Sequence, residues 1–150
     1  MRSGLSKHRW LSCSLFAPNA HSSPQNLLTL GPIYHLCRKT RQVVAYAVGD
    51  RSKRTCLRLW EAIPSAYRQG HCFTDFWTAY SAVIPSEQHT AVGKETGETA
   101  HVERWNNTLR QRLARFVRMT LSFSKSAVIH EACLLIFLHR YNQEQAILFK

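Results

Sequence analysis

Acidic residues are scarce in this chain. Nine Asp and Glu stand against twenty Lys and Arg, which gives a formal net charge of +11 and a pI near 10.0. The first carboxylate is Asp50, so the first third of the chain contains none. A field of this sign attracts polyanions, among which nucleic acid is the commonest. An anionic membrane surface is the alternative, but no Lys-rich amphipathic helix with an aromatic face stands out.

Long apolar runs and paired cysteines are also missing. No run approaches the roughly 20 residues that span a bilayer, and the run 11–17 is too short for a signal peptide. The five cysteines are odd in number, and no two of them form a Cys-x-x-Cys pair. This pattern argues against a disulfide framework or a zinc knuckle and favours a reducing compartment. We therefore expect a cytoplasmic protein that does not enter a membrane.

The content of the chain is that of a globular domain, because 45% of its 150 residues are apolar. The segment 1–34 has no regular period and is predicted to be irregular. Two β-rich runs then predict a hairpin, and the second run is apolar enough for a strand covered on both faces. These strands are expected at 33–37 and 42–48.

Helices and short strands are expected to alternate after the hairpin. Ser52 can cap a helix that buries Cys56, Trp60 and Ile63 and that stops at Pro64. The further expected elements are a strand at 71–74, a helix at 76–83, an edge strand at 88–92 and a loop at 93–99.

The carboxyl-terminal third is expected to be helical. A basic helix is predicted over 99–118 and a second helix over 126–143, with a break at 122–126 between them. The second helix places an apolar stripe on one face, formed by Val128, Ala132, Leu135 and Ile136. This order of elements predicts an α/β fold with a mixed sheet flanked by helices.

Asp75 and Glu103 are the candidate catalytic and metal-binding residues. Asp75 ends an apolar strand, where α/β sheets place their active sites, and Glu103 lies on the basic helix. Two converging carboxylates can bind Mg²⁺ and support phosphoryl transfer. Alternatively, Asp75 caps the following helix and Glu103 is a solvated residue paired with arginines.

The helix around Glu103 is rich in arginine, which matches phosphate oxygens with its planar fork. Asn106, Asn107 and Arg110 share the face of Glu103 at helical spacing. A solvated cationic face is the alternative. The eight histidines form no metal-ligand pattern. The candidate DNA-binding residues are Arg104, Asn107, Arg110, Arg112 and Arg115.

Two segments of the sequence resemble a known family. Residues 102–115 read Val-Glu-Arg-Trp-Asn-Asn-Thr-Leu-Arg-Gln-Arg-Leu-Ala-Arg, and 121–126 read Leu-Ser-Phe-Ser-Lys-Ser. Together with Thr-Asp-Phe-Trp-Thr-Ala-Tyr at 74–80, they resemble transposases of the bacterial insertion-sequence-one family. The likeness runs from about Leu36 to Tyr141.

The resemblance implies a ribonuclease-H-like (integrase/transposase) core and an Asp-Asp-Glu triad that binds two Mg²⁺ ions. Asp75 would be the second acid, Glu103 the third, and Arg110 a contact to DNA phosphate near the active site. Such enzymes cut at the element ends and join the 3′-hydroxyl to target DNA. The implied partners are therefore element-end and target DNA, with a possible homo-oligomer and association with the nucleoid.

This sequence departs from the family at the first acid. The family carries it in an Asp-Glu-x-Trp setting on a strand before the hairpin, and no such motif occurs here. Asp50 follows the second hairpin strand, which is the wrong place. We therefore expect 35–150 to be a partial DDE catalytic domain that lacks its first strand, preceded by an unrelated or out-of-frame segment at 1–34. Such a transposase would be catalytically incomplete; the alternatives are a non-catalytic basic DNA-binding fragment and a relic without function.

Overall fold

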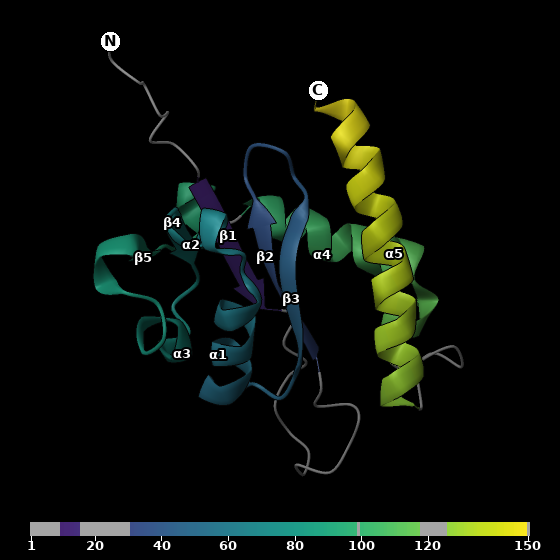
Figure 1. The fold of residues 1–150 in the computed structure, drawn as a ribbon, viewed down its shortest axis with the longest axis horizontal. Coiled ribbons are helices and arrows are strands. Elements are labelled where there is room, and N and C mark those ends of the chain that lie inside the picture. Colours follow the sequence, from purple (N-terminus) through teal and green to yellow (C-terminus); the bar gives the residue numbers. More distant parts are fainter. Residues whose placement is uncertain (1–9, 16–30, 99, 118–125, 150) are drawn as a thin grey trace.

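A mixed five-stranded sheet forms the centre of the molecule (Figure 1). The computed structural model describes residues 10–15, 31–98, 100–117 and 126–149. The strand order is β3-β2-β1-β4-β5; β2 runs antiparallel to both β1 and β3, whereas β4 runs parallel to β1 and β5 runs parallel to β4. The strands are β1 (Trp10–Leu15), β2 (Gly31–Cys37), β3 (Val43–Gly49), β4 (His71–Thr74) and β5 (His89–Ala91).

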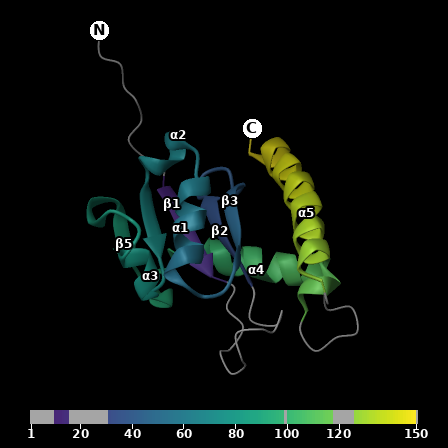
Figure 2. The same cartoon turned by 60° about the horizontal axis from the view of Figure 1, so that its bottom comes forward.

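Helices cover both faces of this sheet (Figure 2), so the predicted α/β class and its flanked mixed sheet are confirmed. The α-helices are α1 (Lys53–Ala62), α2 (Ser65–Arg68), α3 (Thr78–Ser81), α4 (Ala100–Arg112) and α5 (Ala127–Leu148). Short 3₁₀ helices lie at η2 (Ser86–Gln88), η3 (Lys94–Thr96) and η4 (Ala114–Phe116). Within the described residues, no helix has the length and apolar character to cross a membrane.

The prediction that the first strand is missing is wrong. β1 (Trp10–Leu15) occupies the centre of the sheet and pairs with β2 on one side and β4 on the other. The predicted irregular segment 1–34 therefore contains a strand, and β2 already begins at Gly31. A short central strand in a covered sheet needs no apolar–polar alternation, so its sequence carries no period to reveal it. None of its six residues is acidic.

One face of the sheet packs against α1 and α3. Ile33 of β2 contacts a core that includes Cys56, Leu59 and Ile63, all at most 2% exposed. Ser52 caps α1 by accepting a hydrogen bond from the Thr55 N–H at 3.4 Å, and the helix ends before Pro64. The predicted cap and stop of this helix are thus confirmed; on its predicted face, Cys56 and Ile63 are buried and Trp60 is partly buried.

The other face packs against α4 and α5, with Trp105 at the centre. Its ring meets Tyr34 edge-on at 5.5 Å between centroids and lies 5.7 Å from Phe137 and 4.4 Å from Tyr141. The predicted helix 99–118 is too long, because α4 ends at Arg112 and Leu113 takes an extended conformation. That turn in the chain lets Phe116 enter the same core, where it is 1% exposed.

The predicted apolar stripe of the last helix does not face the core. Val128, Leu135 and Ile136 are 78%, 48% and 72% exposed, and Ala132 is exposed too. The buried positions are His130, Leu134 and Leu138. α5 carries apolar residues around most of its circumference, so amphipathic pattern cannot select the buried side. The helix also continues past the predicted 143, to Leu148.

Asn142 of α5 joins this helix to the edge strand β3. Its side-chain amide accepts a hydrogen bond from the Val43 N–H and donates one to the Val43 carbonyl, both at 2.8 Å. Gln42 adds a bond from its side chain to the Asn142 carbonyl at 3.1 Å. A side-chain amide thus takes the place of a neighbouring strand and covers backbone groups that would otherwise be open to edge-to-edge association.

Replacing the central tryptophan tests this packing. We expect Trp105→Ala to lower the free energy of unfolding by about 3–5 kcal/mol, because a buried aromatic ring is lost and a cavity remains. Leu135→Ala, at a position 48% exposed, should change it by less than about 1 kcal/mol. Urea unfolding at pH 7 measures both. Similar losses in the two variants would contradict the assigned buried face.

Buried His35 makes stability depend on pH. Burial lowers its pKa from 6.5 to about 4, so between these values the unfolded chain binds a proton that the folded chain does not. Stability is therefore complete above pH 6.5 and falls as the pH drops towards 4, by about 3 kcal/mol at roughly 1.4 kcal/mol per pKa unit. Urea unfolding across this pH range should show the fall, and His35→Leu should flatten it. An unchanged pH profile in that variant would count against His35 as the source.

Candidate active site and basic helix

Asp75 lies directly after β4, at the carboxyl end of the strand. Its Oδ1 accepts a hydrogen bond from the Trp77 N–H at 3.1 Å, and its side chain is partly exposed. α3 begins at Thr78 and has no side-chain cap bond, so Asp75 holds the turn before the helix instead of capping it. Arg51 lies over the Trp77 ring at 5.6 Å, and Phe76 is 69% exposed. The turn thus presents a carboxylate beside an exposed ring and a guanidinium.

The register of β1 identifies which of its residues lie level with this carboxylate. Ser12 pairs with Phe73 of β4, so two further residues along the parallel strands bring Ser14 level with Asp75. Ser14 also pairs with Tyr34 of β2. The backbone beside Asp75 is therefore that of a central strand, and the residue in register with it is a serine.

Glu103 lies on one flank of α4. Val102, Trp105 and Leu109 are buried against the sheet, and at 3.6 residues per turn they fix the rotation of the helix. Glu103, Asn107 and Arg110 then lie together on one flank, and all three are exposed. His101 and Arg104 lie on the opposite flank. Arg104 therefore lies on a different flank of α4 from the candidate residues Glu103, Asn107 and Arg110.

The carboxylates do not form a complete metal site in the described part of the chain. No three His, Cys, Asp or Glu side chains there lie close enough together to bind a metal ion. Asp50 is no substitute, because its Oδ1 accepts hydrogen bonds from Ser52 Oγ at 2.6 Å and Thr55 Oγ1 at 2.8 Å. Those bonds lower the pKa of Asp50 and fix the start of α1. Asp75 and Glu103 fall short of the ligand set of a two-metal centre.

The predicted DNA-binding arginines do not form one continuous row. Arg112 is paired with Glu144 of α5 at 2.8 Å, so its charge is partly compensated. Arg115 is exposed but belongs to η4, after the helix has ended. Arg110 is the candidate arginine that shares the flank of Glu103.

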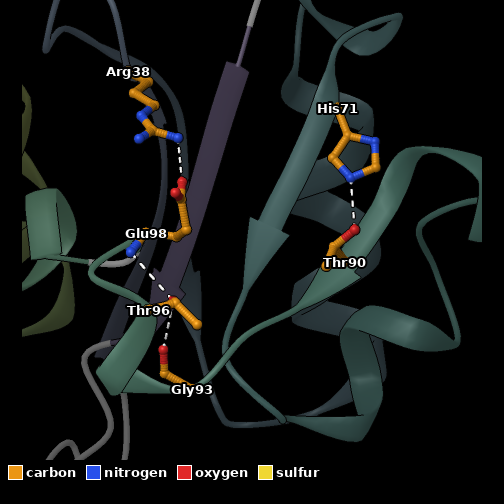
Figure 3. A network of polar contacts seen from close by, with 6 residues as sticks. All are labelled: Arg38, His71, Thr90, Gly93, Thr96 and Glu98. Atoms are coloured by element: carbon orange, nitrogen blue, oxygen red, sulfur yellow. Dashed lines mark hydrogen bonds and ion pairs between the residues drawn. The ribbon is translucent and has the colours of Figure 1, made fainter.

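A second basic group includes Arg38 of the turn between β2 and β3, whose side chain meets Glu98 of the segment before α4 (Figure 3). Arg38 pairs with Glu98, whose N–H donates to Thr96 Oγ1 at 3.3 Å, while that hydroxyl donates to the Gly93 carbonyl at 2.8 Å. The Arg38 guanidinium also lies 6.0 Å from the centre of the Phe73 ring. These contacts hold the segment before α4 beside β4. At the neighbouring strands, His71 Nε2 lies 2.7 Å from Thr90 Oγ1.

Electrostatic coupling shows that this group includes residues of α4. Burial and the nearby charges of Arg104 and Arg38 lower the pKa of Arg41. Burial and the charges of Arg41, Arg38 and Arg104 likewise lower the pKa of His101. Sequence reasoning missed Arg38 and Arg41 as site residues. The available signal was the Arg-Lys-Thr-Arg run at 38–41, between the two β-rich runs that predicted the hairpin.

The sequence pattern of the IS1 transposase family matches residues 25–143. The match covers well over half of the chain, which therefore belongs to this family, the transposases of an insertion sequence. It begins after β1 and includes the other four strands, both acids and the basic helix.

Individual relatives agree with this assignment. The insertion element iso-IS1n protein InsB of Shigella dysenteriae is 35% identical over 105 residues, covering 69% of this chain and 76% of that protein. The insertion element IS1 protein InsB of Shigella flexneri is 37% identical over 98 residues, covering 65% and 72%. The insertion element IS1 4 protein InsB of Escherichia coli strain K12 is 37% identical over 98 residues. These residues are 65% of this chain and 55% of that protein. No solved structure matches the chain.

The structural role of Asp75 can be separated from any chemical role. Asp75→Asn keeps an oxygen that accepts from Trp77, so we expect its unfolding free energy to stay within about 0.5 kcal/mol of the parent value. Asp75→Ala loses this bond and should cost about 1 kcal/mol. Thermal and urea unfolding measure the difference. Equal effects of the two substitutions would show that the Trp77 bond contributes nothing.

Proposed function

We propose that this chain is an insertion-sequence transposase with an incomplete catalytic centre, which binds DNA but neither cuts nor joins it. The observation that carries the proposal is the central strand Trp10–Leu15, which has no carboxylate at any position although it lies beside the strand that ends at Asp75. The family assignment supplies DNA as the partner.

The strand arrangement supports a ribonuclease-H-like core. An antiparallel set of three strands continues through β1 into two parallel strands, which is the order expected of that fold. In such a core the first acid of the triad belongs on β1 and the second at the end of β4. Asp75 fits the second position and Glu103 the third. Ser14 stands at the β1 position in register with Asp75.

The missing acid bears directly on the chemistry. A two-metal phosphoryl transfer needs both ions held about 3.5–4 Å apart, so that they stabilise the attacking and the leaving oxygen. Mg²⁺ keeps several waters and is usually bound through one or two carboxylates together with substrate phosphates, so two carboxylates could hold one ion but leave too few protein ligands for a pair. Asp75 and Glu103 would still be the residues that bind any Mg²⁺ near the DNA.

DNA binding depends on different residues. Asn107 and Arg110 share the exposed flank of Glu103, and Arg115 is exposed just beyond α4. Arginine forks bind phosphate oxygens, and the net charge of +11 favours approach to DNA over long range. These contacts do not require the missing acid.

The extent of the family match limits our hypothesis of an unrelated or out-of-frame segment to the residues before 25, because the match includes 25–34. The match starts at residue 25, so β1 lies outside it. We propose that 35–150 is a partial catalytic domain and that residues of the segment 1–34 complete its sheet without supplying its first acid.

Strand transfer into plasmid DNA tests the proposal. The substrate is a pre-cut duplex that carries the terminal sequences flanking the gene, with Mg²⁺ or Mn²⁺ present. We expect no joining by the natural chain, but gel-shift binding whose affinity falls steeply with salt. Ser14→Asp should gain metal-dependent joining, and this gain should disappear when Asp75→Asn is added. Ser65→Asp, an exposed control on α2, should gain nothing.

Two results would overturn the proposal. Joining by the natural chain that Asp75→Asn abolishes would show a complete catalytic centre. Absence of any salt-sensitive affinity for duplex DNA would exclude the binding role and leave a relic without function.

A further inference from the structure

We propose that Arg38, Arg41 and Arg104 form a second phosphate-binding site for the DNA backbone, on the flank of α4 opposite Glu103. The proposal rests on the proposed function for its ligand and adds a contact region on the other flank of α4. Its parts come from two elements far apart in the sequence: the turn between β2 and β3, and the first half of α4.

The turn holds Arg41 in an unusual backbone conformation. The Arg41 N–H donates to the Cys37 carbonyl at 2.8 Å, and the Cys37 N–H donates to the Gln42 carbonyl at 2.9 Å, which closes the loop. Arg41 has a φ of 60°, and no other non-glycine residue of the described chain has a positive φ. Glycine or asparagine suits this conformation better. The sequence therefore places an arginine where the backbone alone would favour a smaller residue.

The Arg41 side chain has unused hydrogen-bonding capacity. Its Nη1 is buried and has no hydrogen-bond partner among the described residues. A buried donor on a charged group is costly when unsatisfied, so a partner from outside the chain would be favoured there. Tyr141 of α5 lies close enough to influence the pKa of Arg41. Arg41 as a whole is half-buried, within electrostatic range of both α4 and α5.

The charges around Arg41 are unbalanced. Arg104 and Arg38 both act on it electrostatically, and the one carboxylate in this group, Glu98, is paired with Arg38. Three guanidinium groups and one carboxylate leave two positive charges uncompensated. Arginine binds phosphate through parallel hydrogen bonds, which an ammonium group cannot form. A backbone phosphate offers both the charge and the acceptor oxygens that Arg41 lacks.

Glu98 gives the site an internal competitor. Its carboxylate occupies the Arg38 guanidinium, and Thr96 and Gly93 hold the peptide that carries it (Figure 3). An incoming phosphate would have to share or displace this carboxylate. Neutralising Glu98 should therefore strengthen phosphate binding.

The test compares charge-removing variants of the full chain. Asn replaces Arg41 because it tolerates positive φ, and Ala replaces the exposed Arg104 because it favours helix. We expect Arg41→Asn and Arg104→Ala each to weaken duplex binding about tenfold and to reduce the slope of log affinity against log salt by about 0.9. Glu98→Gln should strengthen binding. Arg54→Ala, an exposed control on α1 at the other face of the sheet, should leave the slope unchanged.

Inorganic phosphate provides a readout that does not depend on DNA. About 50 mM phosphate should raise the Tm of the natural chain above its value in sodium chloride of equal ionic strength, and this rise should vanish in Arg41→Asn. If the natural chain binds no DNA but shows this difference, the proposed function is contradicted while the phosphate site stands. Unchanged DNA salt slopes in both arginine variants, or an equal phosphate effect in Arg41→Asn, would overturn the second site.

Discussion

The indole of Trp105 is buried between the sheet and α5, where it contacts Tyr34, Phe137 and Tyr141. Once this ring is fixed, helix geometry determines the direction of every polar side chain on α4. Glu103 and Arg110 must lie on one flank and Arg104 on the other. An aromatic contact in the core thus divides the helix into a side that carries the remaining acid and a side that adds charge to the basic turn. The direction of the charged side chains of α4 therefore depends on packing that involves no charged group.

Local signals in the sequence predicted the elements that local interactions determine. Ser52 and Pro64 mark the ends of α1, and the β-rich runs around the basic turn predict the hairpin. The elements that escaped prediction depend on tertiary surroundings. β1 is recognisable only by its place between β2 and β4, and α5 is apolar on so many sides that its contacts select Leu134 and Leu138 in place of Leu135 and Ile136.

In the candidate site too, some residues could be found from local sequence and others only from the fold. Asp75 and Glu103 stand in sequence motifs, so resemblance to the family was enough to select them. Arg38 and Arg41 are joined to Arg104 only by the fold, across more than 60 positions of sequence, and no spacing rule connects a hairpin turn to a later helix. The sequence also suggested one row of arginines, whereas the end of α4 at Arg112 and the pairing of Arg112 with Glu144 interrupt it.

The central strand shows how the fold can form without an acid on β1, as the proposed incomplete catalytic centre requires. The sheet requires from β1 a backbone that pairs on both sides, and a serine-containing strand satisfies this requirement as well as an acidic one. In the proposed catalytic centre, a carboxylate on β1 would add like-charge repulsion with Asp75, which metal ions must offset. Its absence removes that repulsion, so selection for folding alone would not restore it. The phosphate contacts proposed at Arg110 and at the basic turn involve neither β1 nor a metal. Under this proposal, binding of DNA would depend on α4 and the β2–β3 turn, and chemistry on DNA would depend on the acids beside the central strand.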